Sequence, residues 1–177
     1  MFSEHKKPTD LLSLLKLDEY ISFDLETTGL DPDNDRIIEI SACRFVKGEF
    51  SDEFTSLINP GIPIPKNITT LTGITNQMVK EAPVVTDIIP DCIKFLGKTP
   101  LLGHNLNFDY LFLSKNMEST DLILPELTLY DTLLLARSFI YFHNSFSLSS
   151  LCDYYGIKIE KAHRARADAL ATGELFL

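Results

Sequence analysis

The sequence predicts one α/β domain built on a mixed β-sheet whose faces are covered by helices. The first observation is that three β-rich runs come early in the chain, at 20–25, 36–46 and 49–58. The second is that helical and short β-rich segments then alternate to the end, a pattern typical of α/β folds. The third is the length of 177 residues, which suits one domain with a substantial core.

An N-terminal helical extension is expected over 1–19, ahead of the domain at 20–177. Thr9 and Asp10 can cap a short helix here, because their side chains accept hydrogen bonds from the first free amides of a helix. The leucines of this helix fall largely on one face: Leu11, Leu12, Leu14 and Leu15.

The three β-rich runs are expected to form a meander. Side chains alternate from 20 to 25, and a cluster of turn-forming residues from Gly29 onward ends this first strand. Lys47 and Gly48 join the next two runs as a tight hairpin. The prolines within 59–65 exclude a helix or a central strand, because proline lacks an amide donor and restricts the residue before it. This segment is therefore expected to be a crossing loop.

Helices alternate with short strands in the rest of the chain. The expected elements are, in order, helices at 67–71, 76–80 and 84–96, a strand at 101–103, a helix at 107–117, a strand at 127–130, and helices at 132–139, 147–155 and 165–177. Pro83 and Gly97 mark the two ends of the longest of the first three helices. Asp131 is the expected N-cap of the helix that starts at residue 132.

Composition and charge limit the classes of function. The net charge of −9 opposes binding to a phosphate backbone, because affinity for nucleic acid ordinarily comes from Lys and Arg. This objection weakens if some of the carboxylates bind divalent cations.

Cys43, Cys92 and Cys152 lie in apolar stretches and are expected to be buried thiols. No apolar run is long enough to span a membrane, so a cytoplasmic location is expected.

Two carboxylates stand at the end of the first strand. Asp24 and Glu26 are two residues apart, so both project from the same face. Their mutual repulsion at the end of a buried strand is costly unless they share a proton or hold a cation. The alternative is an exposed strand end whose acids have no special role. The turn that follows, Thr27-Thr28-Gly29, favours a site because it offers amides and hydroxyls just beyond the acids.

Three further residues carry chemistry. Asp109 lies in an apolar helix, where a carboxylate needs a donor, a cation or a proton unless the helix dipole supports it. His163 and Asp168 are separated by about 140° around a regular helix and cannot converge from its middle. They can converge if His163 lies on the loop that enters a helix starting near Arg164. The alternative for His163 is an ordinary surface or core histidine.

These residues fall in three ordered motifs: FDLETTGL at 23–30, GHNLNFD at 103–109 and HRARADALAT at 163–172. Together the motifs resemble the DEDDh 3′→5′ exonucleases, most closely the proofreading exonuclease modules of bacterial replicative DNA polymerases such as DNA polymerase III. The histidine subtype is indicated because the tyrosine subtype would carry tyrosine at the position of Arg164.

Two intervening segments, LTGITNQM at 71–78 and DTLLLAR at 131–137, are also similar to that family. Thr72 stands where some members carry histidine, a departure that concerns a nearby substrate contact and none of the acids. A basic cluster near the third motif either contacts phosphates or is a solvated helix start: Lys158, Lys161, Arg164 and Arg166.

The resemblance implies a ribonuclease-H-like sheet of five strands, in which two parallel strands join a three-strand antiparallel meander. It implies two divalent cations, Mg²⁺ or Mn²⁺, with His163 as general base. The implied metal ligands are Asp24, Glu26, Asp109 and Asp168. The implied contacts with the terminal nucleotide are Thr27, Thr28 and Leu30, with Leu30 as a wedge against its base, and the candidate pocket residues are Asn105 and Phe108. Expected products are nucleoside 5′-monophosphates from single-stranded or frayed DNA 3′ ends, in replication proofreading or repair.

Other functions stay open at this level. An RNA-directed exonuclease of the same family would differ in a few pocket atoms near the 2′-hydroxyl. A non-catalytic binding module of a larger assembly would be expected to lose some of the acids, and none is lost. The apolar helix that ends the chain suggests a module of a longer polypeptide, with a DNA polymerase or helicase as the larger chain or partner subunit. A free-standing repair nuclease is also consistent with the motifs.

Overall fold

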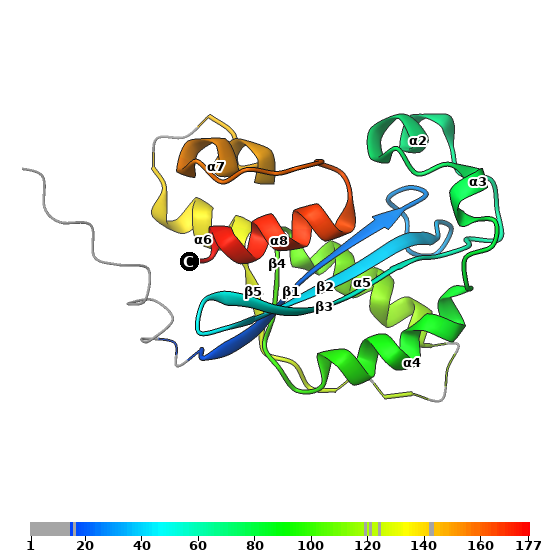
Figure 1. The fold of residues 1–177 in the computed structure, drawn as a ribbon, viewed down its shortest axis with the longest axis horizontal. Coiled ribbons are helices and arrows are strands. Elements are labelled where there is room, and N and C mark those ends of the chain that lie inside the picture. Colours follow the sequence, from blue (N-terminus) through cyan, green and yellow to red (C-terminus); the bar gives the residue numbers. More distant parts are fainter. Residues whose placement is uncertain (1–14, 16, 119, 121, 124, 142–143) are drawn as a thin grey trace, which may run out of the picture.

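The computed structural model describes residues 15, 17–118, 120, 122–123, 125–141 and 144–177. The predicted N-terminal helix, apart from Leu15, lies outside these residues. One β-sheet with helices packed on it makes up the described part (Figure 1). Within that part, no helix combines the length and the apolar character that crossing a membrane requires.

Five strands form the sheet in the order β3-β2-β1-β4-β5. β1 (Glu19–Thr27), β2 (Ile37–Val46) and β3 (Glu49–Leu57) form the predicted antiparallel meander. The short strands β4 (Leu101–Gly103) and β5 (Leu129–Asp131) extend the sheet in parallel pairing beyond β1. The mixed five-stranded sheet is therefore confirmed, and β5 begins slightly later than the sequence predicted.

The hairpin between β2 and β3 is also the predicted one. Lys47 and Gly48 have φ angles of 53° and 81°, so both turn residues adopt left-handed backbone. A two-residue turn of this kind matches the right-handed twist of the flanking strands, and glycine makes its second position accessible. The turn sets the register in which Val46 pairs with Glu49.

Helices cover both faces of the sheet. They are α2 (Lys66–Thr72), α3 (Asn76–Val79), α4 (Val85–Leu96), α5 (Leu106–Met117), α6 (Thr132–Phe139), α7 (Leu148–Tyr155) and α8 (Ala165–Leu175). α4 and α5 lie on one face and α8 lies on the other (Figure 1). α7 packs against α8, and α2 and α3 stand near the carboxyl end of β1 (Figure 1).

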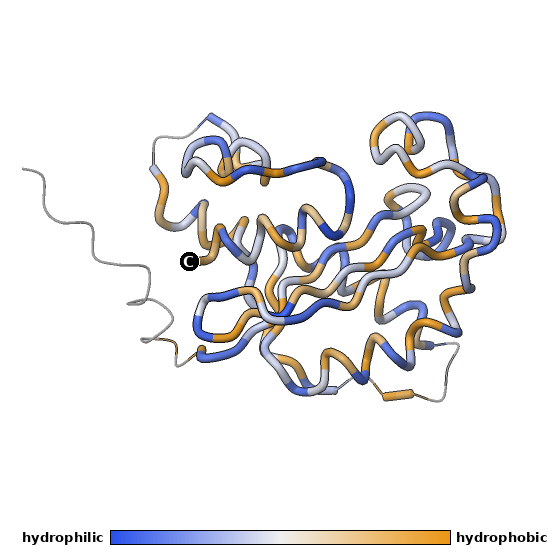
Figure 2. The backbone as a smooth tube through the Cα atoms, viewed as in Figure 1, coloured by the Kyte–Doolittle hydropathy of each residue, from blue (hydrophilic) through white to orange (hydrophobic). Residues whose placement is uncertain are grey.

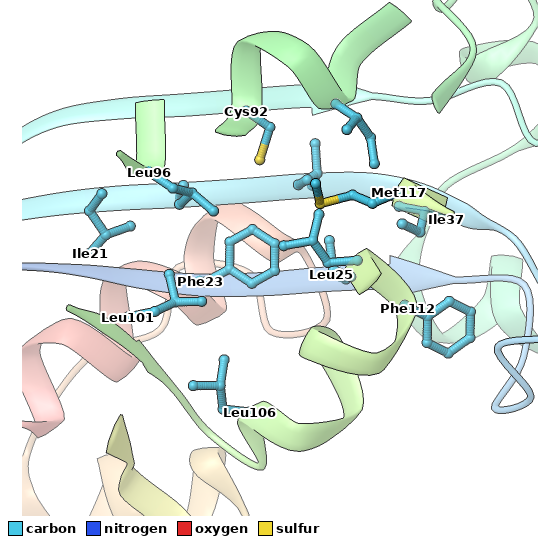
Figure 3. Close-up of a cluster of buried hydrophobic side chains, with 14 of the residues drawn as sticks. Ile21, Phe23, Leu25, Ile37, Cys92, Leu96, Leu101, Leu106, Phe112 and Met117 are labelled. Atoms are coloured by element: carbon cyan, nitrogen blue, oxygen red, sulfur yellow. The ribbon is translucent and has the colours of Figure 1, made fainter. Parts of the chain in front are cut away.

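The main core lies between β1, β2 and the helices α4 and α5. Ile21, Phe23 and Leu25 point into it from β1, as the alternation predicted, and they pack with Cys92 and Phe112 (Figure 3). Because successive side chains on a strand point to opposite faces, the residues between these three face α8. The cysteines that the structure describes are buried free thiols, as predicted: Cys43, Cys92 and Cys152.

α8 is held closely to the other face of β1. The Tyr20 hydroxyl donates a hydrogen bond to the Gly173 carbonyl at 3.0 Å, and the Ser22 hydroxyl donates to the Ala169 carbonyl at 2.5 Å. A Cβ atom at Gly173 would lie 2.2 Å from a ring carbon of Phe45, so only glycine permits this approach. The first turn of α8 is thereby brought over the end of β1 that carries the acids.

Candidate active site

Three carboxylates that are distant in the sequence meet on the α8 face of the sheet. One oxygen each from Asp24, Glu26 and Asp168 lies within 4.8 Å of the others. Asp24 and Glu26 come from β1, and Asp168 comes from the first turn of α8. A divalent cation with metal–oxygen distances of about 2.0–2.6 Å fits such a cluster. The structure therefore brings together three of the four acids that the resemblance implied as metal ligands.

Asp109, the fourth acid, lies beside this cluster. It is 4% exposed in the first turn of α5, and its Oδ1 accepts a hydrogen bond from the Leu25 amide at 2.9 Å. Because Leu25 lies between Asp24 and Glu26, this bond ties α5 to the strand that carries both acids. The sequence required a donor, a cation or a proton for Asp109, and the Leu25 amide is the donor.

His163 lies on the loop that enters α8, as predicted. Its φ of 61° is left-handed, and the helix begins at Ala165 after the N-cap residue Arg164. The His163 amide donates a hydrogen bond to Asp168 Oδ2 at 2.9 Å, so this carboxylate holds the loop as well as facing the other acids. The histidine is exposed, and the loop around it is mostly hydrophilic (Figure 2).

Burial raises the pKa of each of the four acids, and repulsion by other members of the cluster adds to the increase for Asp24 and Glu26. Burial is the main cause of the increase in the pKa of Glu26 to about 8 and of Asp109 to about 8. The pKa of Asp24 is raised well above its usual value by burial and then by the neighbouring carboxylates, Asp109 first. Burial also raises the pKa of Asp168, while the amide and the charge of His163 act in the opposite direction. Protons or cations would therefore stabilise this cluster.

The metal-free protein is expected to lose stability as the pH rises from about 5 to 8. A carboxyl whose folded pKa lies above its unfolded pKa contributes stability below the unfolded value and loses it as the pH rises through the folded value. At about 1.36 kcal/mol per pKa unit, the free energy of unfolding should fall by about 2 kcal/mol or more. Urea unfolding with chelator at both pH values measures this change. Equal stability at pH 5 and pH 8, or no gain on adding Mg²⁺ at pH 8, would contradict the clustered arrangement.

The turn after β1 directs two threonine side chains inward and a leucine outward. The Thr27 hydroxyl donates to the Gly29 carbonyl at 2.6 Å, and the Thr28 hydroxyl donates to Asp35 Oδ1 at 3.0 Å. A Cβ at Gly29 would lie 2.3 Å from an oxygen of Asp35, so glycine makes room for this carboxylate. Leu30, in contrast, is 82% exposed. The threonine hydroxyls therefore shape the turn, and the Leu30 side chain is open to a ligand.

The two other predicted pocket residues lie at the start of α5. Asn105 is exposed and has a left-handed φ of 67° immediately before the helix. Phe108 is half-buried, with its ring centroid 4.9 Å from that of Phe112, and it packs against the main core. Asn105 is thus the more accessible of the two.

Asp131 supports the site from a distance. It caps α6, as predicted, by accepting hydrogen bonds from the Leu133 and Leu134 amides. Its two carboxylate oxygens also accept hydrogen bonds from the amides of Asn105 at 3.1 Å and Leu106 at 3.0 Å. This second role, which the sequence pattern missed, fixes the start of α5 and with it the helix that carries Asp109.

Two members of the predicted basic cluster form ion pairs within the protein. Arg164 pairs with Glu39 of β2, and Arg166 pairs with Glu53 of β3. The two lysines of that cluster are therefore the better candidates for contacts with phosphate. Sequence reasoning also missed Glu39, although a carboxylate inside an apolar strand signals that a charged partner is needed.

The family follows from a comparison with known proteins. Residues 21–176 match the family model RNase_T, which is described as Exonuclease. The chain belongs to this exonuclease family. Its place among the nucleases agrees with the cluster of acids on β1 and α8.

Two bacterial DNA polymerases are among the relatives of this chain. The DNA polymerase III PolC-type protein of Caldanaerobacter subterraneus subsp. tengcongensis is 39% identical over 159 residues, which cover 90% of this chain and 11% of that protein. The DNA polymerase III PolC-type protein of Bacillus subtilis is 38% identical over 167 residues, which cover 93% of this chain and 12% of that protein. The exonuclease-family chain therefore spans a small part of these relatives.

Solved structures share the fold. A structure of exonuclease X in complex with 5′ overhanging duplex DNA has a TM-score of 0.70 and 25% identity, covering 88% of this chain and 87% of that chain. A structure of exonuclease I has a TM-score of 0.79 and 22% identity, covering 89% of this chain and 40% of that chain. The ribonuclease-H-like mixed sheet that the resemblance implied is thus confirmed.

Proposed function

We propose that this domain, residues 20–177, is a metal-dependent 3′→5′ DNA exonuclease that releases nucleoside 5′-monophosphates. The observation that carries the proposal is the convergence of Asp24, Glu26 and Asp168 within 4.8 Å on an exonuclease-family fold. Replication proofreading is the proposed setting, because the PolC-type relatives are DNA polymerases by name. The proposed partner is a replicative polymerase, as a larger chain or as a separate subunit.

Two divalent cations fit the donor set. The side chains that would hold them are Asp24, Glu26, Asp109 and Asp168. All of their donor atoms are carboxylate oxygens, which Mg²⁺ and Mn²⁺ prefer. Asp24 would be the central ligand of this set, because it interacts electrostatically with each of the other three acids. Bound there, the cations would stabilise the attacking and leaving oxygens of a displacement at phosphorus.

His163 would accept the proton of the attacking water. Histidine suits this role because it exchanges a proton near neutral pH. Two observations support the assignment: the histidine is exposed, and its amide is held by Asp168, a member of the acid cluster. The ring therefore lies on a loop whose position is coupled to the carboxylates.

The terminal nucleotide would lie over the turn that follows β1. Leu30 is the proposed wedge against the terminal base, because its side chain projects from this turn. Thr27 and Thr28 would contribute through the backbone that their hydroxyls hold in place. Asn105 and Phe108, at the start of α5, are the further contacts we propose. The proposed phosphate contacts are Lys158 and Lys161.

Replacing Leu30 with Ala is expected to impair release from paired DNA more than from single-stranded DNA. A wedge is needed to separate a paired terminal base, and the lost apolar contact corresponds to about 1.4 kcal/mol, or about tenfold in rate. Initial rates on the two substrates measure the effect. Leu134 is also exposed, on α6, so Leu134→Ala is the matched control. Equal losses on both substrates would contradict the wedge.

The direct test of the proposed function is nucleotide release from matched substrates. The protein is incubated with 3′-mismatched DNA, fully paired DNA and single-stranded RNA, each with Mg²⁺, Mn²⁺ or chelator. Nucleoside 5′-monophosphates are expected from DNA with either metal, fastest at a mismatched end, and none with chelator. Products from a 5′-labelled strand establish the direction of degradation. Faster release from RNA than from DNA would replace the proposed substrate, and release with chelator would remove the metal.

A further inference from the structure

Glu39 is a buried residue near the acid cluster, and both of its carboxylate oxygens accept hydrogen bonds. It is 1% exposed on β2 and stands opposite Glu26 in the antiparallel register. Arg164 donates to it through Nε, at 3.2 Å from Oε1 and 3.0 Å from Oε2, and through a terminal nitrogen at 2.5 Å from Oε1. The Ala165 amide donates to Oε2 at 2.9 Å. One side chain thus binds two consecutive residues of the α8 entry.

The start of α8 depends on this carboxylate. Arg164 is the N-cap residue, and its side chain makes no capping hydrogen bond of its own. The first amides of a helix need acceptors, and a negative charge near them is favoured by the helix dipole. Glu39 supplies both from a strand that lies far away in the sequence, whereas most helices are capped by a neighbouring residue.

The bond network continues to the residues of the proposed site. His163 precedes Arg164 and has a left-handed backbone, a conformation that costs a non-glycine residue free energy unless its surroundings hold it. On one side the His163 amide binds Asp168 Oδ2. On the other side the next two residues are bound by Glu39. The junction between loop and helix is therefore anchored at two carboxylates, one inside the acid cluster and one outside it.

We propose that Glu39 is a positioning residue, which holds Arg164 and the Ala165 amide and thereby sets where the His163 loop stands relative to Asp168. Glu39 does not touch the substrate in this arrangement, because the guanidinium of Arg164 and the helix start cover its oxygens. The kinetic part of this inference rests on the proposed function, and its structural part does not.

Glu39→Gln is the principal variant. An amide oxygen can still accept the Ala165 hydrogen bond, but the neutral side chain cannot balance the charge of Arg164. The kcat for nucleotide release from single-stranded DNA is expected to fall about ten- to hundredfold, with KM changed by no more than about twofold. Arg164→Lys is the second variant, since it keeps the charge but lacks the two-pronged geometry. It is expected to lower kcat in the same direction.

Arg166→Gln is the matched control. Arg166 lies two residues after Arg164, and the substitution breaks its ion pair with Glu53. This pair is more exposed than the pair of Glu39 and Arg164. Its kcat is expected to stay within about twofold of the original. Urea unfolding of every variant checks that the folded protein is being assayed. If Glu39→Gln does not fold, Arg164→Lys decides the kinetic outcome.

A double variant separates positioning from general destabilisation. If Glu39 acts by placing His163, adding Glu39→Gln to His163→Ala should cost much less than it costs alone. Fully additive losses, or an unchanged kcat in both Glu39→Gln and Arg164→Lys while Asp24→Asn abolishes release, would overturn the inference and leave the proposed function intact.

A spectroscopic readout keeps the test independent of turnover. The Cε1–H resonance of His163 in the metal-free protein at fixed pH should move in Glu39→Gln and stay in place in Arg166→Gln. A resonance that does not move in Glu39→Gln overturns the positioning role, whatever the activity assays find. If Asp24→Asn left release unaffected, the proposed metal site would fail, and this resonance would still decide the placement of the loop.

Discussion

Replacing Asp24 with Asn is expected to abolish metal-dependent nucleotide release, with a loss in kcat of at least about a thousandfold. Asp24 interacts with Asp109, Asp168 and Glu26, and an amide cannot balance two cations. The same change should preserve or raise the stability of the metal-free protein at pH 8, because it removes a buried charge. Single-turnover release with Mg²⁺ and urea unfolding with chelator measure the two effects.

Asp91→Asn is the control for this substitution. Asp91 is an exposed acid on α4, which lies on the other face of the sheet. Its replacement is expected to leave both release and stability unchanged, since exposed substitutions usually have small effects. Turnover of Asp24→Asn close to the original rate, or an equal loss in Asp91→Asn, would refute the proposed metal site.

Replacing His163 with Ala is expected to slow the chemical step about a hundredfold or more, while the fold and metal binding are retained. The structural hydrogen bond to Asp168 comes from the backbone amide, which any residue except proline can supply. The exposed ring is therefore free for proton transfer, and its removal leaves the acids in place. Single-turnover rates report the chemical step, and calorimetric titration with Mn²⁺ reports metal binding.

A second variant guards against backbone strain at this position. His163 has a φ of 61°, which alanine adopts less readily than asparagine. His163→Asn should therefore show the same loss in rate with a smaller loss of stability. Single-turnover rates that match the original protein in both variants would remove His163 from the mechanism. Loss of Mn²⁺ binding in both would assign it a role in metal binding instead.

Some features of the fold and of the site could be predicted because the geometry of a few neighbouring residues determines them. A strand has a side-chain period of two, so Asp24 and Glu26 had to share a face opposite Phe23 and Leu25. The positions of Lys47 and Gly48 were predictable for a similar reason, since few residue pairs suit a two-residue hairpin. The same holds for Asp131 as the N-cap of α6, because the capping preference involves adjacent residues.

Other features depended on contacts that strand periodicity and capping preferences do not encode. The hydroxyls of Thr27 and Thr28 turn inward because Gly29 and Asp35 accept their hydrogen bonds, and this leaves Leu30 exposed. The resemblance implied contacts with the terminal nucleotide from all three, with Leu30 as a wedge against its base. The short strand β5 also began later than expected, because pairing with β4 and not its own composition sets its limits.

By itself, the sequence determined that Asp24 and Glu26 share one face of a strand, and it indicated that His163 can meet Asp168 only from the loop ahead of α8, since both follow from backbone geometry within a few residues. The tertiary structure alone decided that Asp168 meets Asp24 and Glu26, and that Glu39 of β2 holds Arg164. These contacts join strands to a helix more than a hundred residues away. They depend on strand order and on the close packing of α8 against β1, which no local pattern encodes.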